Sequence, residues 1–246
     1  MAKKYTTTMF LEDTTEDFQR SILVTGSKVH ANASFNTFGI SSSFSVGAWF
    51  KKLSAGESGY LFHFNTPGNT DVINVVCEAD GDVQIEISDN SGNTKLWRWD
   101  VLTLTSNWYN LIITWNGTDV GLILNGSDQG APDSKVVDES VTTIDASRDL
   151  IWIGANENPV TQVLQGYHNG LAIWDTALDV DDASELYVGE FGFDLSANSG
   201  TYDKASNLQH WWRVSSKDTG STDRVGSVDF VNSVGITVSD ITTVIP

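Results

Sequence analysis

The chain has 246 residues, and its 32 acidic against 14 basic residues give a formal net charge of −18. No cluster of lysine and arginine stands out, which excludes nucleic acid as an expected partner, because phosphate binding depends mainly on clustered cations. Nine Trp, six Tyr and eleven Phe with only four Pro favour a β-sandwich core, and the length allows one large all-β domain or two smaller domains.

The cysteine content indicates where the chain folds. Cys77 is the only cysteine, so no intramolecular disulfide forms and folding needs no oxidising compartment. It lies in the apolar run VINVVC, which favours a buried small side chain over a reactive nucleophile. The N-terminus lacks an apolar signal segment, and no run approaches the roughly 20 apolar residues of a membrane span. We therefore expect synthesis in a cytoplasm and no membrane insertion.

The first 20 residues differ from the rest of the chain. They are polar, rich in threonine and short of apolar periodicity, which predicts an arm that becomes ordered against a partner. Residues 21–246 contain no internal repeat and no Pro-rich linker. We therefore expect an N-terminal arm at residues 1–20, with an anchoring role, and a single domain at residues 21–246.

Short strands dominate the first half of this domain. Alternation of apolar and polar residues predicts strands at residues 21–29, 33–41, 44–52, 60–64, 72–78, 83–88 and 96–102. The strongest is FSVGAWFKK, in which Phe44, Val46 and Phe50 share one face. Asp80 and Gly81 form a turn signal that would close a hairpin.

Residues 108–126 give the clearest local signal. Two alternating segments, 108–115 and 120–124, are separated by Asn-Gly and followed by a second Asn-Gly, which predicts a meander of three strands. One irregular strand is expected within residues 127–147.

Residues 150–188 form the most informative unit. They predict a strand (150–154), a polar loop (155–165), a second strand (167–174) and one short helix (179–187). In the second strand Leu171 and Trp174 face opposite sides, which is typical of a strand covered on both faces. Asp179 is a good helix N-cap, and the helix should end by Gly189. Beyond it, strand patterns return at residues 208–214 and 227–238.

Three segments together are similar to one known family. They are FSVGAWF followed by GYLFHF, then WYNLIITWNGTDVGLILNG, and finally IGANENPVTQVLQGYHNGLAIWDTALDVDDASELYVG. In these segments the chain resembles the concanavalin A-like jelly rolls, in their laminin G-like and pentraxin-like branch, over roughly residues 21–214. The resemblance implies an all-β fold in which two antiparallel sheets form a jelly-roll sandwich, with one short helix near residues 179–187. It does not specify a function.

The resemblance also implies a place for calcium. In pentraxin-like members, carboxylate and amide oxygens from two loops hold the ion, and calcium takes six to eight oxygens. Carried over by position, the ligands would be Thr70, Asp71, Asn156, Glu157, Asn158 and Gln162. Thr70, Asn156 and Asn158 stand where the family usually has acidic residues, which weakens calcium binding. The alternative is a polar loop that only connects strands.

A β-glucanase of the same superfamily would need two carboxylates on alternate residues of one strand. The most similar run, Glu78, Asp80 and Asp82, straddles the predicted turn, and Glu86 and Asp89 have a different spacing. We therefore predict that the protein is not an enzyme.

The pair Trp97 and Trp99 leaves two alternatives open. The two rings share a strand face with Val101 and are candidate ligand-binding residues that would stack on a sugar. Packing in an aromatic-rich sandwich core is the favoured alternative.

Two function classes follow. The first is a non-enzymatic structural protein of a virus particle, such as a phage decoration, fibre or tail-associated protein. Its adhesion domain would bind a cell-surface glycan or receptor, and its arm would join other virion proteins in an oligomeric assembly. It would be made in the host cytoplasm and reside in the virion. The second is a free lectin-like protein that binds carbohydrate, with calcium as its possible cofactor. The first accounts better for the lack of a signal peptide and of disulfides.

Overall fold

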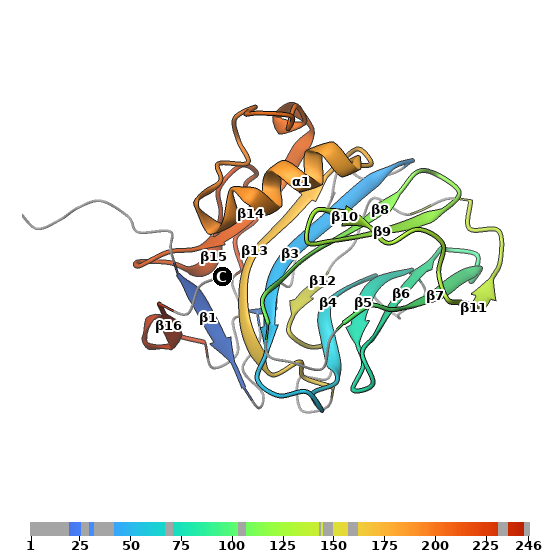
Figure 1. Ribbon diagram of the computed structural model, residues 1–246, viewed down its shortest axis with the longest axis horizontal. Helices are drawn as coiled ribbons and strands as arrows, with labels where there is room; N and C mark the ends of the chain where they lie inside the picture. Colours follow the sequence, from blue (N-terminus) through green and yellow to red (C-terminus); the bar gives the residue numbers. More distant parts are fainter. Residues whose placement is uncertain are drawn as a thin grey trace, which may run out of the picture.

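Two antiparallel sheets stack face to face and form a sandwich (Figure 1). The computed structural model describes residues 20–25, 30–31, 42–66, 71–102, 107–142, 144, 150–156, 162–230 and 236–243. Every pairing between named strands is antiparallel. The all-β sandwich expected from the sequence is confirmed. The predicted arm at residues 1–20 lies outside the described residues except for Arg20.

The larger sheet has nine strands. Its main order is β10-β9-β8-β3-β13-β1-β16, and β14 pairs with both β13 and β15. The strands are β1 (Ser21–Val24), β3 (Phe44–Lys52), β8 (Tyr109–Trp115), β9 (Val120–Leu124), β10 (Ser127–Asp128), β13 (Gly166–Trp174), β14 (Leu208–Val214), β15 (Thr219–Asp223) and β16 (Ile241–Thr242).

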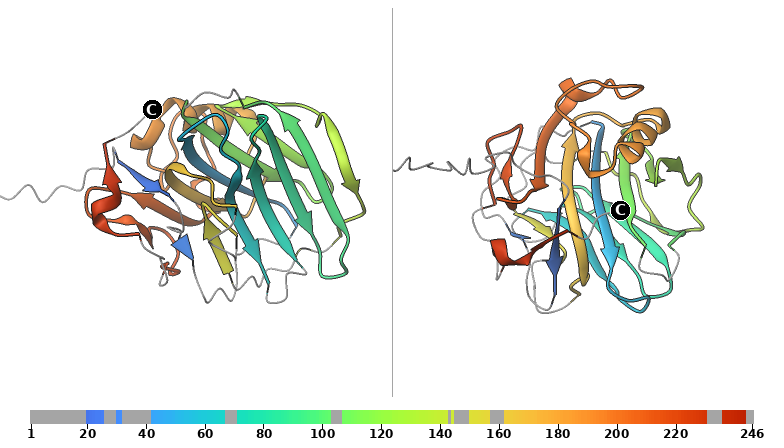
Figure 2. Two further views of the ribbon diagram at one scale, coloured as in Figure 1. Left: turned by 90° about the horizontal axis from the view of Figure 1, so that it is seen from below. Right: turned by 60° about the vertical axis from the view of Figure 1, so that its left-hand side comes forward.

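The smaller sheet has seven strands in the order β11-β7-β6-β5-β4-β12-β2. They are β2 (His30–Ala31), β4 (Gly59–Asn65), β5 (Val72–Cys77), β6 (Asp82–Ser88), β7 (Thr94–Asp100), β11 (Ser134–Asp138) and β12 (Leu150–Ile153). Figure 2 shows β4 to β7 side by side. The hairpin between β5 and β6 closes at Gly81, which has a φ of 109°, as the turn signal predicts.

The core lies between the two sheets, because alternate residues of each strand point to the same face. The smaller sheet contributes side chains such as Phe64, Val75 and Ile85, and the larger sheet contributes Phe50 and Ile113. All five side chains are fully buried. This apolar layer accounts for most of the stabilising burial, at about 25 cal/mol for each Å² removed from water.

The helix α1 (Val180–Val188) covers the outer face of the larger sheet (Figure 1). Asp179 caps its N-terminus by accepting a hydrogen bond from the backbone N–H of Asp182, and Gly189 caps its C-terminus, both as predicted. Leu186 packs with Trp174 in a second apolar cluster on this face. The nine-stranded sheet is therefore covered on both sides, as the pattern of β13 indicates.

The region after β14 corrects one prediction. The strand expected at 227–238 is not found in its described residues, because 227–230 and 236–237 are outside any strand and η3 (Val238–Asp240) follows. Residues 231–235 lie outside the described residues. The second partner of β14, besides β13, is the polar strand β15, which the sequence pattern does not indicate. Residues 225–228 instead wrap the buried carboxylate of Asp223, which accepts backbone N–H groups of Val225, Gly226 and Val228. Two further 3-10 turns, η1 (Glu190–Gly192) and η2 (Ala205–Asn207), lie between α1 and β14.

Among the described residues, no helix is both long and apolar enough to cross a membrane.

His168 of β13 is a buried titratable group. Its Nε2 donates to the carbonyl of Leu164 at 3.1 Å, and its Nδ1 has no hydrogen-bond partner among the described residues. Burial is the main cause that lowers the pKa of His168 to about 4, against the opposing effect of the Leu164 hydrogen bond. The imidazole is therefore neutral near pH 7.

We expect the free energy of unfolding to fall as the pH drops from about 6.5 to 4. In this range the unfolded chain binds a proton at His168 that the folded chain does not, so acid favours unfolding, by an amount on the order of 3 kcal/mol. Urea unfolding at several pH values measures the effect.

His168→Gln is the matched variant, because its amide still donates to Leu164, and its unfolding free energy should change less over this range. The raised pKa values of Asp82 and Asp182, caused mainly by burial, act in the opposite direction but are common to both proteins. Equal pH profiles for the two proteins would contradict the assignment to His168.

Candidate functional site

A groove of about 520 Å³ crosses the outer face of the seven-stranded sheet. It is open on the side that faces away from the core, and its volume falls within the roughly 300–1,000 Å³ of small-ligand sites. Strands β4, β5 and β6, the turn at residues 89–93 and the start of β7 form it. Its lining residues are Tyr60, His63, Val72, Asn74, Glu86, Ser88, Asn90, Ser91, Gly92 and Thr94.

A row of three polar side chains forms the centre of the groove. His63 of β4 pairs with Asn74 of β5, and Asn74 pairs with Glu86 of β6. Their strand neighbours Phe64, Val75 and Ile85 belong to the core, so alternation turns the row outward. Asn74 Nδ2 donates to Glu86 Oε2 at 2.9 Å, which orients both groups. Asn74 Oδ1 has no hydrogen-bond partner among the described residues.

A β-bulge in β4 supplies the aromatic wall of the groove. Tyr60 pairs with Val76 and Phe62 pairs with Val75, so Leu61 is an extra residue on β4. Leu61 and Phe62 both point into the core. Tyr60, directly before the bulge, therefore points to the outer face, as His63 does after it. The rings of Tyr60 and His63 consequently meet edge to face, with centroids 5.3 Å apart.

The turn between β6 and β7 is held rigid by Asp89. Its Oδ1 accepts backbone N–H groups of Ser91 and Asn93 at 2.9 and 3.1 Å, and its Oδ2 accepts the N–H of Thr142 at 3.1 Å. Burial alone would raise the pKa of Asp89, but hydrogen bonds from Asn93, Thr142 and Ser91 outweigh burial and lower it. The carboxylate stays ionised near neutral pH, and the turn that lines the groove is preorganised.

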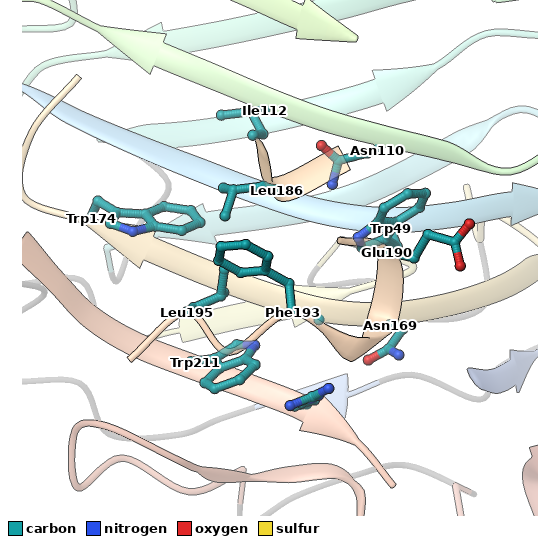
Figure 3. A pocket seen from close by; sticks show the side chains of 13 residues that line it. Trp49, Asn110, Ile112, Asn169, Trp174, Leu186, Glu190, Phe193, Leu195 and Trp211 are labelled. Atoms are coloured by element: carbon teal, nitrogen blue, oxygen red, sulfur yellow. The ribbon is translucent and has the colours of Figure 1, made fainter. Parts of the chain in front are cut away.

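The face covered by α1 holds a second depression, of about 40 Å³ (Figure 3). Trp174, Phe193 and Trp211 crowd it, and Asn110 and Glu190 add polar atoms. A volume of this size holds a few water molecules, since one water needs about 10–15 Å³. The outer-face groove is therefore the candidate binding site.

The predicted calcium ligands are only partly brought together. Asn156 Nδ2 donates to Gln162 Oε1 at 3.0 Å, so these two residues of the second loop are in contact. Asp71 is fully buried at the start of β5. Thr70, Glu157 and Asn158 lie outside the described residues. No group of three or more His, Cys, Asp or Glu side chains suited to a metal occurs in the described part of the chain.

Strand register shows why Asp71 is separate from the other two. The carbonyl of Asp71 accepts from Thr66, directly after the end of β4, whereas the carbonyl of Gln162 accepts from Tyr60 near its start. Five residues of extended chain from Tyr60 to Asn65 span roughly 16 Å. Oxygens within about 2.6 Å of one calcium ion cannot be that far apart. Asp71 therefore does not fit one calcium site together with Asn156 and Gln162, and calcium binding by the remaining expected ligands stays a prediction.

The two candidate stacking residues lie in the core. Trp97 is 2 % exposed and Trp99 is 1 % exposed, and both point between the sheets. Trp99 Nε1 donates to the carbonyl of Gly130, and the ammonium of Lys135 lies 4.0 Å from the ring centroid of Trp97. The placement matches the core-packing alternative and contradicts the prediction that these rings bind a ligand.

Sequence reasoning missed the groove residues as a set. His63, Asn74 and Glu86 are 11 and 12 residues apart along the chain, and only strand register brings them into one row. Two signals were available. Asn74 is the one polar residue in the apolar run of β5, and β6 has polar residues at alternate positions next to it in the predicted hairpin.

A family model described as the concanavalin A-like lectin/glucanases superfamily, of laminin G type, matches residues 25–184. The chain belongs to this superfamily. The match covers the whole smaller sheet, strands β3, β8, β9, β10 and β13 of the larger sheet and the first part of α1, and it confirms the laminin G-like resemblance noted from the sequence. No curated protein sequence matches the chain.

Solved structures share the superfamily fold at low identity. A candidate carbohydrate-binding protein of Bacteroides ovatus is 13 % identical with a TM-score of 0.51, and the match covers 80 % of this chain and 52 % of that one. The binding domain of botulinum neurotoxin serotype D is 18 % identical with a TM-score of 0.50, over 69 % of this chain and 42 % of that one. A heptameric SAP-like pentraxin of Limulus polyphemus is 17 % identical with a TM-score of 0.49, over 68 % and 80 %. The chain thus spans about half or less of the first two proteins, and these likenesses concern the fold alone.

We expect Asp71 to have no part in any response to calcium. The difference in melting temperature between EDTA and added calcium should be the same for the native chain and for Asp71→Asn, because Asp71 cannot share an ion with Asn156 and Gln162. Thermal melts of both proteins measure it, with Gln162→Ala as the control for the second loop. A calcium-dependent difference that disappears in Asp71→Asn alone would contradict the separation.

Proposed function

We propose that this protein is a non-enzymatic carbohydrate-binding domain whose ligand lies in the outer-face groove. The observation that carries the proposal is the row of His63, Asn74 and Glu86 beside the ring of Tyr60. The name of the Bacteroides ovatus protein is in line with it.

The chemistry of the row suits sugar hydroxyls. A hydroxyl both donates and accepts, and a carboxylate beside an amide offers matching acceptors and donors at fixed positions. Glu86 is half-buried and keeps acceptor capacity beyond its bond to Asn74, whereas Asn74 is 2 % exposed and serves to orient that carboxylate. Tyr60 adds an aromatic edge and face against which the apolar side of a sugar ring can pack.

Carboxylate spacing supports binding rather than catalysis. Within the described part of the chain, Glu86 is the one carboxylate that lines the groove. Asp82 shares its strand face, but four residues of strand separate the two by roughly 13 Å, more than the roughly 5–9.5 Å of glycosidase pairs. Gln84 stands between them and accepts two hydrogen bonds from Arg98, at 3.0 and 2.7 Å.

We further propose that the domain belongs to a structural protein of a virus particle, such as a phage decoration, fibre or tail-associated protein. It would be made in the host cytoplasm, join other virion proteins through residues 1–20 and present the groove to a cell-surface glycan. One observation favours this setting over a free lectin-like protein in an oxidising compartment. Cys77 is the only cysteine, so the fold uses no intramolecular disulfide. Burial also raises the pKa of its thiol to about 12, which keeps the thiol protonated.

Two substitutions in the groove test the binding site. Glu86→Gln and Tyr60→Ala are each expected to weaken glycan binding about tenfold, which corresponds to about 1.4 kcal/mol. The first removes a charged acceptor and the second removes the aromatic wall. Glycan arrays followed by calorimetry on the ligands identified measure the effect.

Asp119→Asn is the matched control, because it makes the same change of charge at an exposed site in the β8–β9 turn of the other sheet. Melting temperatures establish that each variant is folded. Native affinity in both groove variants would place the ligand elsewhere.

The arm is tested by incorporation into particles. Removal of residues 1–19 is expected to leave a soluble, folded domain that no longer co-sediments with assembled particles. The cut precedes Arg20, whose carbonyl accepts a hydrogen bond from Asn169 Nδ2 at 2.7 Å and so belongs to the domain. Unchanged co-sedimentation would contradict the anchoring role.

A further inference from the structure

Among the described residues, the groove has no lysine or arginine to bind an acidic ligand. Its described lining instead includes the carboxylate of Glu86. The cation on the same face that is nearest in register, Arg98, directs its guanidinium to Gln84 through two hydrogen bonds. Lys95 is on the opposite face of β7, where its ammonium pairs with Asp138 at 2.8 Å. An anionic group in the groove would meet Glu86 without a compensating partner.

The net charge of the whole chain also disfavours the binding of an anionic ligand. A net charge of −18 gives the surface a negative potential, which lowers the local concentration of anions. Recognition of an acidic sugar normally relies on a cation that can bind its carboxylate, sulfate or phosphate in pairs of hydrogen bonds. Like charges placed against each other instead reject a ligand.

The dimensions of the groove indicate more than one sugar unit. The row of polar residues and the turn extend from β4 to β7, and four adjacent strands at about 4.8 Å spacing span roughly 14 Å. The aromatic wall stands at the β4 end and the rigid turn at the β7 end. This length suits a segment of a glycan rather than a single ring.

We infer that the groove selects neutral oligosaccharides and rejects glycans that carry a carboxylate, sulfate or phosphate at the bound segment. The selectivity rests on the proposed carbohydrate-binding function. Glu86 is its specificity-determining residue, since it repels the acidic group and also binds the hydroxyl that a neutral sugar has in the same place.

Matched pairs of immobilised glycans test the selectivity on the full chain. Each pair shares one backbone and differs only in an added sialic acid, uronic acid or sulfate. We expect the neutral member to bind at least about tenfold more tightly, and the gap to narrow as salt screens the repulsion. Acidic members that bind as well as neutral ones, or better, would overturn the selectivity but leave the carbohydrate-binding function standing. Binding to no glycan would overturn that function itself.

Variants of the groove separate charge from shape. Glu86→Gln should weaken neutral binding yet reduce the ratio of neutral to acidic affinity, because the repulsive charge is gone. Ser91→Lys should increase binding of the acidic members, whereas Ser91→Gln, of similar length and no charge, should not. Ser91 suits this comparison because it is exposed at the groove and its backbone N–H, rather than its side chain, holds the turn. Equal ratios in all four proteins would contradict the role of charge.

Discussion

The apolar layer between the two sheets determines the direction of every other side chain. Strand residues alternate, so once Val75 and Ile85 are committed to the core, Asn74 and Glu86 must point outward. A slip of one residue in either strand would bury that polar pair and expose the core. Core packing thus fixes the strand register, and the register fixes which side chains line the groove. The positions of these side chains are therefore as rigid as the core.

The outer face of the larger sheet is covered by other parts of the chain, whereas that of the smaller sheet has an open groove. Helix α1 and the connection to β14 cover the larger sheet with a second apolar cluster that includes Trp174, Leu186 and Trp211. The described residues under that cover line a depression of about 40 Å³, whereas those of the smaller sheet line an open groove of about 520 Å³. One face of the sandwich is therefore used for stability and the other is available for recognition, which is consistent with a binding role for this member of the concanavalin A-like superfamily.

Local patterns in the sequence predicted most of the fold. The residues of the candidate site could not be predicted in the same way, because strand pairing between distant segments brings them together. The strands around Phe50 and Ile113, the turn at Gly81 and the helix capped by Asp179 follow from alternation, glycine and capping, all of which act over a few residues. Strand β15 was missed because its sequence TGSTD is polar and its pairing depends on β14. The separation of Asp71 from Gln162 by β4 was missed for a related reason, because likeness of loops along the chain does not show strand register.

The bulge at Leu61 has a consequence for how related sequences are compared. The alternation of inward and outward residues along β4 shifts by one at Leu61. Tyr60 and His63 therefore lie on the same face although they are three positions apart. An ungapped alignment to a homologue without the extra residue would assign Tyr60 to the interior and compare it with a core aliphatic residue. The residue that forms the groove wall in a relative should therefore be identified only after alignment by strand pairing. Two adjacent apolar core residues, as at Leu61 and Phe62, mark the bulge.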